Sequence, residues 1–284
     1  MIASLKNTSF DMIHDAFVDA FSEYEVKMDM PKDKLMEMFS ARSLSKGKSI
    51  GYFEEENLIG FLLIGYRKIG NLSVFYDLAT GVRKKYQGRK IADKLICEIK
   101  DLMVENEIDK FVLEVLEHNV PAQNLYMKYG FRISRKFKCY EYISENRKSD
   151  NISKAKIASI DIQLNNLPVS EYCTFVPSWQ NSMVSYLNAK NNYYVARIIE
   201  DNRLIGYGIV HRANGSILQL GMDPGWRTIE NIERIVDELY VNTQSNVLKY
   251  LNVEENSIME KLILDIGFKN TINQLEMEYK INVT

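Results

Sequence analysis

Cysteine and histidine are scarce in this sequence, and their positions argue against a metal site or a disulfide framework. The 284 residues include three of each. Cys97, Cys139 and Cys173 are scattered and odd in number, so we expect reduced, mostly buried thiols in a cytoplasmic protein. The three histidines also lack the spacing of metal ligands. We therefore expect no metal.

Long apolar runs and an excess of basic charge are missing as well. No apolar run is long enough to cross a bilayer as a helix, and the first residues lack the basic-then-apolar pattern of a signal peptide. The formal net charge is -2, which argues against general nucleic-acid binding. We therefore expect neither a nucleic acid nor a membrane as partner.

The most informative feature that is present is a strand followed by a basic turn and a helix. Residues 72–82 form an apolar run with Asp77 as its only charged residue and predict a strand, and apolar residues at helical spacing predict a helix from Ile91. Five basic residues lie between them, around Gln87 and Gly88: Arg83, Lys84, Lys85, Arg89 and Lys90. Free N–H groups and the helix dipole favour phosphate at such a terminus. The turn predicts a pyrophosphate site, or else a solvated loop, and it carries neither Gly-x-Gly-x-x-Gly nor Gly-Lys-Ser/Thr.

A second pattern follows downstream of this helix. Residues 111–116 predict a strand, residues 118–121 a turn, and residues 122–129 a short helix. Gly130 ends the helix, and Phe131 leads into a further strand. The two motifs, taken in this order, carry a resemblance to a known family.

The sequence resembles the GCN5-related N-acetyltransferase (GNAT) superfamily over roughly residues 1–145. The acetyl-CoA loop of that family reads Val-x-x-x-x-Gln/Arg-x-x-Gly-x-Gly/Ala, and Val82, Gln87 and Ala92 match it. Lys90 stands where a small residue usually lies, which bears on how closely a pyrophosphate approaches. The later family pattern is matched by these residues: Leu113, Val115, Asn119, Ala122, Leu125, Tyr126, Gly130 and Phe131.

The resemblance implies an α/β (α+β) fold with a mixed, mostly antiparallel sheet flanked by helices, and acetyl-CoA as the cofactor. In the family, the strand that ends near Val82 and the strand of residues 113–116 splay apart, and the pantetheine arm lies in the slot between them. Gly81 fits a bulge that opens this slot, or an ordinary strand glycine. Asn119 fits a coenzyme contact, or a turn residue before Pro121. The expected coenzyme-binding residues are Thr80, Gly81, Val82, Gln87, Gly88, Arg89, Lys90, Ile91, Ala92 and Asn119.

Acetyl transfer to an amine needs an acid for the departing thiolate and a base for the amine. By resemblance Tyr126 is the general acid, because a phenol of pKa about 10 protonates this thiolate without special tuning; the alternative is a packed helix tyrosine. Glu114 is the expected base, because an apolar slot raises the pKa of a carboxylate; the alternative is a solvent-facing or salt-bridged glutamate. Asp77, Glu117 or a water relay are the reserve candidates.

The acceptor is expected beside the first two helices. Tyr24, Glu25, Tyr76 and Asp77 combine aromatic and acidic side chains that would receive a cationic amine, or else are solvated loop residues. The first predicted function is an N-acetyltransferase that acts by direct attack in a ternary complex on a small-molecule primary amine. The alternatives are an acetyltransferase for protein N-termini or lysines, and a sensor that binds acyl-CoA without turnover. The donor is acetyl-CoA or a longer acyl-CoA.

The second half of the chain repeats the first. Adding 137 to the residue number places Gly130 on Gly267 and Phe131 on Phe268. A repeat of this length indicates duplicated domains. We predict two tandem GNAT-like modules, a catalytic one at residues 1–145 and a second at residues 158–284, with a polar linker at 146–157.

The two copies differ in the residues at the positions expected to carry the chemistry. Leu251 and Ile263 stand where the first module has Glu114 and Tyr126, and acidic residues replace the basic cluster. We therefore expect the second module to be degenerate for acetyl-CoA and to have a structural role. Since the tandem arrangement satisfies internally what single modules achieve by pairing, a monomer is expected, with a homodimer as the alternative.

Overall fold

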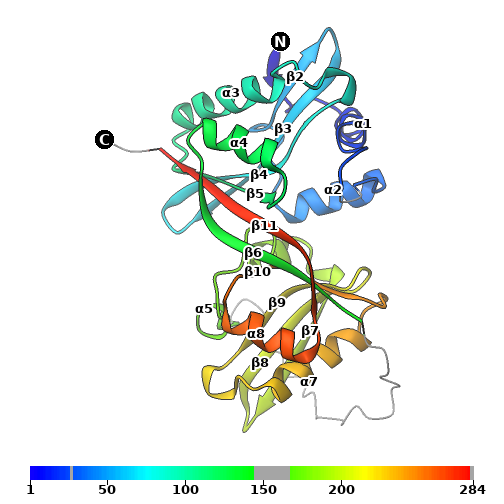
Figure 1. Ribbon diagram of the computed structural model, residues 1–284, viewed down its shortest axis with the longest axis vertical. Coiled ribbons are helices and arrows are strands. Elements are labelled where there is room, and N and C mark those ends of the chain that lie inside the picture. Colours follow the sequence, from blue (N-terminus) through cyan, green and yellow to red (C-terminus); the bar gives the residue numbers. More distant parts are fainter. Residues whose placement is uncertain (26–27, 144–166, 282–284) are drawn as a thin grey trace. The chain divides into compact units, whose positions relative to one another are not determined.

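The computed structural model describes residues 1–25, 28–143 and 167–281, which form two compact units (Figure 1). The first unit comprises Met1–Arg135 and Leu275–Thr284, and the second comprises Lys136–Gln274. The end of the chain therefore belongs to the first unit, whereas the predicted division assigns residues 158–284 to one module. The predicted linker at 146–157 lies outside the described residues.

The first unit contains a mixed sheet with the strand order β1-β2-β3-β4-β5-β11. Neighbouring strands from β1 to β4 pair antiparallel, and β4 pairs with β5 in parallel. Gly70, at φ 59°, takes the left-handed position in the two-residue turn that joins β3 to β4. The strands are β1 (Ile2–Ser4), β2 (Ile50–Glu54), β3 (Asn57–Ile69), β4 (Leu72–Val82), β5 (Lys110–Leu116) and the last part of β11 (Lys269–Lys280).

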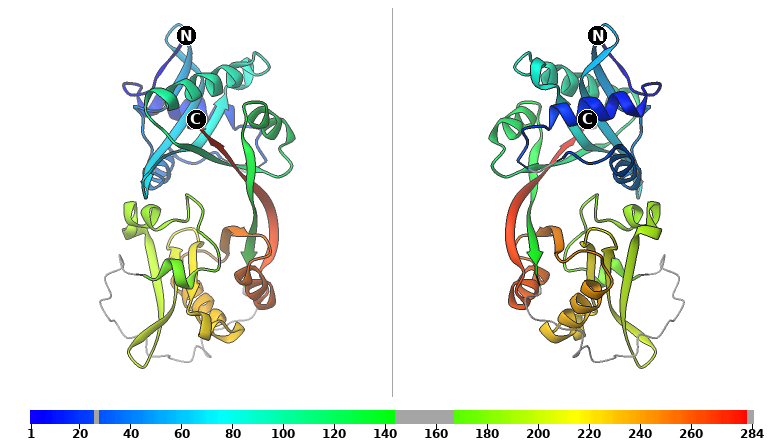
Figure 2. Two further views of the ribbon diagram at one scale, coloured as in Figure 1. Left: turned by 90° about the vertical axis from the view of Figure 1, so that its left-hand side faces the viewer. Right: turned by 90° about the vertical axis from the view of Figure 1, so that its right-hand side faces the viewer.

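Helices cover both faces of this sheet. The helices α1 (Phe10–Ala20) and α2 (Lys32–Ala41) pack on one face, around the buried ring of Phe61. The helices α3 (Ile91–Glu105) and α4 (Val120–Lys128) pack on the other face, around Leu62 and Phe111. Phe61 and Leu62 are adjacent on β3, so strand alternation places the two clusters on opposite faces. Figure 2 shows α3 in front of the sheet in one view and α1 in front in the opposite view.

From its first two helices onward, the second unit repeats the succession of elements of the first: two helices, three strands, a helix, a strand, a helix and a strand. Its strand order is β6-β10-β9-β8-β7. Its strands are β6 (Arg132–Tyr142, from Lys136 on), β7 (Tyr193–Glu200), β8 (Arg203–His211), β9 (Ser216–Met222), β10 (Leu248–Glu254) and the first part of β11. Its helices are α5 (Val169–Tyr172), α6 (Met183–Asn188), α7 (Ile229–Val241) and α8 (Ile258–Ile266). The predicted α/β class with tandem modules is confirmed.

Irregularities in strand register repeat as well as the elements. In the first unit, Ile59 is the extra residue between β2 and β3, and Leu78 is the extra residue between β3 and β4. In the second unit, Ile205 and Leu218 are the extra residues at the corresponding positions. Since each bulge bends its strand and increases the local twist, the two sheets are deformed at matching points.

Candidate functional site

The candidate site lies where β4 and β5 separate. The two strands pair in parallel from Val74 and Lys110 to Tyr76 and Val112, and no later pair joins them within the described residues. The bulge at Leu78 bends β4 just beyond the last pair. The ends of both strands therefore leave a splay at the place where the coenzyme slot is expected.

A buried carboxylate links the two sides of this splay. Tyr126 of α4 donates its hydroxyl to Oδ2 of Asp77 at 2.8 Å, and the hydroxyl of Thr80 donates to the same oxygen at 2.6 Å. Asp77 is only 9% exposed, and its second oxygen, Oδ1, has no hydrogen-bond partner. Burial raises the pKa of Asp77 to about 6, although both hydroxyl contacts oppose the rise. Burial also raises the pKa of Tyr126 well above its ordinary value, and the nearby Asp77 raises it further.

Glu114 lies on the other face of the sheet from Tyr126. Its neighbours Leu113 and Val115 belong to the cluster with Tyr126, so strand alternation directs Glu114 toward the face that α1 and α2 cover. There it interacts with the buried Tyr76, whose pKa is raised well above its ordinary value by burial and by the Glu114 charge. The expected acid and base are thus on opposite sides of the splay.

The loop after α1 contacts the turn between β5 and α4. The Tyr24 hydroxyl hydrogen-bonds with the side chain of Asn119, and the Glu25 carboxylate contacts Nε2 of the His118 ring. Asn119 also caps α4, accepting from the backbone N–H of Ala122 at 3.2 Å. Of the expected acceptor residues, Tyr24 and Glu25 therefore border this turn, while Tyr76 and Asp77 lie on opposite faces of β4.

The basic turn leads into a helix terminus that no side chain caps. Gly88 and Lys90 both adopt left-handed conformations, at φ 77° and φ 56°, and Lys90 is the N-cap of α3 without a side-chain cap. The first N–H groups of α3, beginning at Ile91 and Ala92, are therefore available to an anion. The Gln87 side chain donates back to the carbonyl of Val82 at 3.2 Å, which closes the turn on itself.

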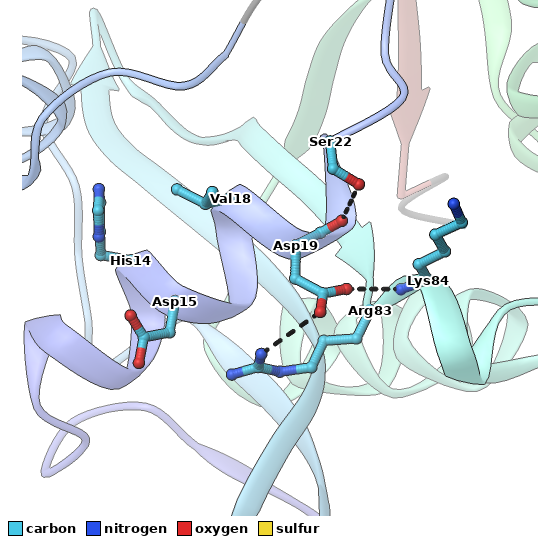
Figure 3. A pocket seen from close by; sticks show the side chains of 7 residues that line it. All are labelled: His14, Asp15, Val18, Asp19, Ser22, Arg83 and Lys84. Atoms are coloured by element: carbon cyan, nitrogen blue, oxygen red, sulfur yellow. Dashed lines mark hydrogen bonds and ion pairs between the residues drawn. The ribbon is translucent and has the colours of Figure 1, made fainter.

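Two of the five basic side chains anchor the turn instead of surrounding a ligand. Asp19 of α1 accepts from the backbone N–H of Lys84 at 2.7 Å, and its other oxygen lies 3.7 Å from the Arg83 guanidinium (Figure 3). The Lys84 ammonium also pairs with Glu23, just past the end of α1. A hollow of about 430 Å³ lies beside these contacts, but none of the expected coenzyme or acceptor residues lines it.

The remaining expected coenzyme residues pack or stack locally. A Cβ at Gly81 would lie 2.5 Å from the Phe61 ring, and the bulge lies at Leu78 instead. The alternative of a bulge at Gly81 is therefore wrong. Gly81 is an ordinary strand glycine, and its missing side chain lets the Phe61 ring pack closely against the strand. Ile91 is buried against Gly60, and the Arg89 guanidinium lies 4.9 Å from the centre of the Tyr86 ring.

The splay of the second unit is bridged by its own chain. The pairs between β9 and β10 end at Ile217 and Tyr250. Gln219 of β9 donates to the Asn181 carbonyl at 2.7 Å, and the Asn181 amide donates to the Leu251 carbonyl of β10 at 2.7 Å. Both amide side chains are at least nine-tenths buried. The position at which β4 and β5 are unpaired in the first unit is therefore spanned by side-chain hydrogen bonds in the second.

The helix terminus of the second unit is also closed. Thr228 caps α7 by accepting from the N–H of Asn231 at 3.2 Å. Asp223, which follows β9, accepts from the N–H of Gly225 at 2.9 Å and pairs with Arg203. These N–H groups already have partners, and the nearby carboxylate repels an anion.

Other expectations concern metals, thiols and membranes. Among the described residues, no three His, Cys, Asp or Glu side chains gather in a way that could hold a metal ion. Cys139 is buried, Cys173 is half-buried and Cys97 is exposed on α3, so the expectation of mostly buried thiols holds fully for Cys139 alone of the three. No helix in the described ranges has the length and apolar character needed to cross a bilayer.

Sequence reasoning missed two contacts of this site. Nothing in the sequence indicated that Asp19 anchors the basic turn, because Asp19 is one acidic residue on the polar side of α1. One feature of the sequence did point to the contact between Asp77 and Tyr126: Asp77 is the only charged residue in the strand of residues 72–82. A lone carboxylate in an apolar strand needs a partner, but the partner is distant in sequence.

Comparison with known proteins supports the fold and the family. Residues 10–131 match the family model described as the acetyltransferase (GNAT) family. The chain is similar to a GCN5-related N-acetyltransferase from Sphaerobacter thermophilus, with 11% identity and a TM-score of 0.72 over 99% of this chain and 95% of that one. It is also similar to a tandem GNAT protein from the clavulanic acid biosynthesis pathway, with 11% identity and a TM-score of 0.66 over 99% and 98%. No curated protein matches the sequence.

Proposed function

Because residues 10–131 match the model of the acetyltransferase (GNAT) family, we propose that the first unit transfers an acetyl group from acetyl-CoA to a primary amine. The observation that carries the proposal is the splay of β4 and β5, with the Tyr126 hydroxyl on the carboxylate of Asp77 at its first unpaired position. A hydroxyl proton is thus held beside unpaired backbone, in a position to protonate a thiolate that leaves from a slot between the strands.

The residues around the splay fit coenzyme A. The backbone of Thr80, Gly81 and Val82 lies past the last pair with β5 and can form sheet-like hydrogen bonds with an amide-containing arm. The uncapped N–H groups of α3 suit the pyrophosphate, at roughly 0.3–1 kcal/mol for each interaction of an anion with the helix terminus. At Gly88 no atom lies within 4 Å of where a Cβ would be, so the turn is open to a ligand.

The two faces of the sheet divide the chemistry between them. On one face, Tyr126 donates its proton to the departing thiolate. On the other face, Glu114 accepts a proton from the amine, directly or through water, as the new carbon–nitrogen bond forms. Since Glu114 lies beside the buried Tyr76, the amine is held near an aromatic ring and a carboxylate. This combination suits a cationic acceptor that must lose a proton before it attacks.

We propose a small-molecule amine as the acceptor in preference to a protein. The contacts of Tyr24 with Asn119 and of Glu25 with His118 tie the loop after α1 to the turn before α4. A loop held in this way narrows the approach to the splay, which disfavours an extended peptide. Protein N-termini, protein lysines and turnover-free binding of acyl-CoA are the outcomes against which the test discriminates.

We further propose that the second unit is degenerate for the coenzyme. The Asn181 bridge occupies its splay, and Thr228 caps the helix that corresponds to α3. A ligand would have to displace buried hydrogen bonds that cost about 1–3 kcal/mol each when left unmade. Its role is then structural support for the first unit.

The test combines calorimetry with a thiol-release assay. Acetyl-CoA is titrated into the wild type and into the double variant Gln87→Glu with Gly88→Asp, which puts two negative charges on the turn. Asn214→Asp with Asn246→Asp adds the same charge at exposed turns of the second unit and serves as the matched control. Binding by the wild type and the control, but not by the turn variant, is expected.

The released thiol is then measured with polyamines, aminosugars, amino-acid derivatives and short peptides as acceptors. Release with a small amine is the expected result, and release only with peptides would favour the protein acetyltransferase. Tight binding with no release by any acceptor would favour the sensor. Failure of the wild type to bind acetyl-CoA would overturn the proposal.

A further inference from the structure

We infer that the carboxyl group of Asp77 is a proton reservoir behind Tyr126. As Tyr126 protonates the thiolate, Asp77 passes its own proton to the phenol oxygen. The inference rests on the proposed acetyl transfer and adds a positioning residue to it. Asp77 acts through Tyr126 and is not assigned a contact with either substrate.

The geometry for such a transfer is already in place. The Tyr126 and Asp77 oxygens are 2.8 Å apart, a distance at which one proton can lie on either oxygen. Both side chains are more than nine-tenths buried, so water does not compete for the proton. Thr80 holds the same carboxylate oxygen from the other side at 2.6 Å, which fixes its orientation toward the phenol.

Electrostatics makes the transfer necessary. If Tyr126 gave up its proton beside an ionised Asp77, two negative charges would remain 2.8 Å apart in a buried site. Like charges at such a distance cannot both be ionised without a large cost. The raised pKa of Tyr126 expresses this cost, since Asp77 is its second cause after burial. A proton on Asp77 removes the cost, because the pair then carries one negative charge after the step.

Asp77 is suited to carry that proton near neutral pH. Burial raises its pKa to about 6, so that protonated and ionised forms are both populated under ordinary conditions. The groups that face it are Tyr126 from α4, and the Thr80 hydroxyl and the Ala79 amide from its own strand. Tyr24 faces Tyr126 from the loop after α1. In the described part of the chain, no cationic side chain pairs with Asp77 to hold it ionised.

The internal repeat provides an independent comparison. The position of Asp77 in β4 corresponds to Ile217 in β9, and that of Tyr126 in α4 corresponds to Ile263 in α8. Both isoleucines are fully buried in one apolar cluster. The unit in which Asn181 spans the splay thus has neither member of the pair, and the unit with the proposed coenzyme slot has both. A purely structural hydrogen bond would not need to depend on the state of the splay.

The proton count balances over one turnover. The carbon–nitrogen bond forms and the carbon–sulfur bond breaks, the thiolate takes the proton of Tyr126, and Tyr126 takes the proton of Asp77. Asp77 ends the step as a carboxylate and is reprotonated before the next turnover from solvent, which receives the proton lost by the amine. No oxidant, reductant or further reactant is required.

The test is the pH dependence of kcat for the wild type, Asp77→Asn and Thr80→Val, at saturating acetyl-CoA and with an acceptor of low amine pKa. In the wild type, kcat should fall as the pH rises through the titration of Asp77. Asp77→Asn keeps an acceptor for the Tyr126 hydroxyl, and should lose this limb and at least about tenfold in kcat. Thr80→Val removes a hydrogen bond that favours the carboxylate, and should move the limb to higher pH.

The outcomes separate the reservoir from the proposed function. The reservoir is overturned, and acetyl transfer still stands, if the wild type turns over and the fall of kcat with pH is the same in Asp77→Asn. The same holds if this fall does not move to higher pH in Thr80→Val. Binding of acetyl-CoA without thiol release by the wild type overturns acetyl transfer, and the reservoir with it. Calorimetry shows that each variant is folded and binds acetyl-CoA, and Thr80→Val decides the matter if Asp77→Asn does not fold.

Discussion

Replacing Asp77 with Asn should change how the stability of the protein depends on pH. The pKa of this carboxyl is about 6 in the folded protein against an ordinary value of 3.8. Between these values the folded state binds more protons than the unfolded state, so the stability of the wild type falls as the pH rises. The difference corresponds to about 3 kcal/mol of lost stability once the pH is well above 6.

The effect of Asp77 on the free energy of unfolding differs between pH 4.5 and pH 7.5. Because proton binding is linked to folding, ionisation of Asp77 lowers the free energy of unfolding of the wild type by about 1 kcal/mol at pH 4.5 and by about 3 kcal/mol at pH 7.5. Asp77→Asn removes this dependence, but it places an amide where Oδ1 has no partner, at a constant cost of about 1–3 kcal/mol. That constant cancels when the two conditions are compared. The free energy of unfolding of Asp77→Asn, relative to wild type, should therefore rise by about 2 kcal/mol from pH 4.5 to pH 7.5.

The assay is urea unfolding at the two pH values, followed by circular dichroism. Tryptophan fluorescence would not report on this site, because Trp179 and Trp226 both lie in the second unit. Pulsed hydrogen exchange on peptides from β4 assigns the transition to the first unit. Asp101→Asn, at an exposed position of α3, makes the same change of charge and should show no such difference. An equal effect of Asp77→Asn at both pH values would refute a desolvated carboxyl at this position.

Three further predictions concern packing, the basic turn and the second unit. Gly81→Ala puts a methyl group 2.5 Å from a carbon of the Phe61 ring, and should destabilise the first unit by about 1–3 kcal/mol; an unchanged Tm would contradict this packing. Asp19→Ala removes the 2.7 Å contact with the turn, and should weaken acetyl-CoA binding up to about tenfold in calorimetry. Asp15→Ala, on the same helix, is its control, and equal losses in both would argue against an anchor. Calorimetry should also give one acetyl-CoA per chain, whereas two would mean that the bridge at Asn181 opens.

Much of the local structure could be predicted from the sequence. The strand at residues 72–82 and the helix from Ile91 have the predicted bounds in β4 and α3. Apolar residues at a fixed period determine such elements, because a strand or helix must bury one side whatever its neighbours are. The repeat of elements in the second half was also visible, since its glycines and hairpins recur at corresponding positions.

The sequence did not determine which of the two units contains the end of the last strand, β11. The predicted boundary places the last strand in the second module, whereas Leu275–Thr284 belongs to the first unit. The apolar pattern of a strand shows that one of its faces is buried, but not which sheet supplies its neighbours. The bulge at Leu78 was unpredictable for a related reason, because register depends on the partner strand.

The sequence by itself indicated the resemblance to the GNAT family, the class of fold and the kinds of residue available for the chemistry. Only the tertiary structure decided how these residues are combined. It placed Glu114 and Tyr126 on opposite faces of the sheet, and it put Asp77, remote in sequence from Tyr126, within hydrogen-bond distance of it. Residue types and periods are local properties of a chain, whereas the pKa of a carboxyl depends on which groups and how much water surround it after folding.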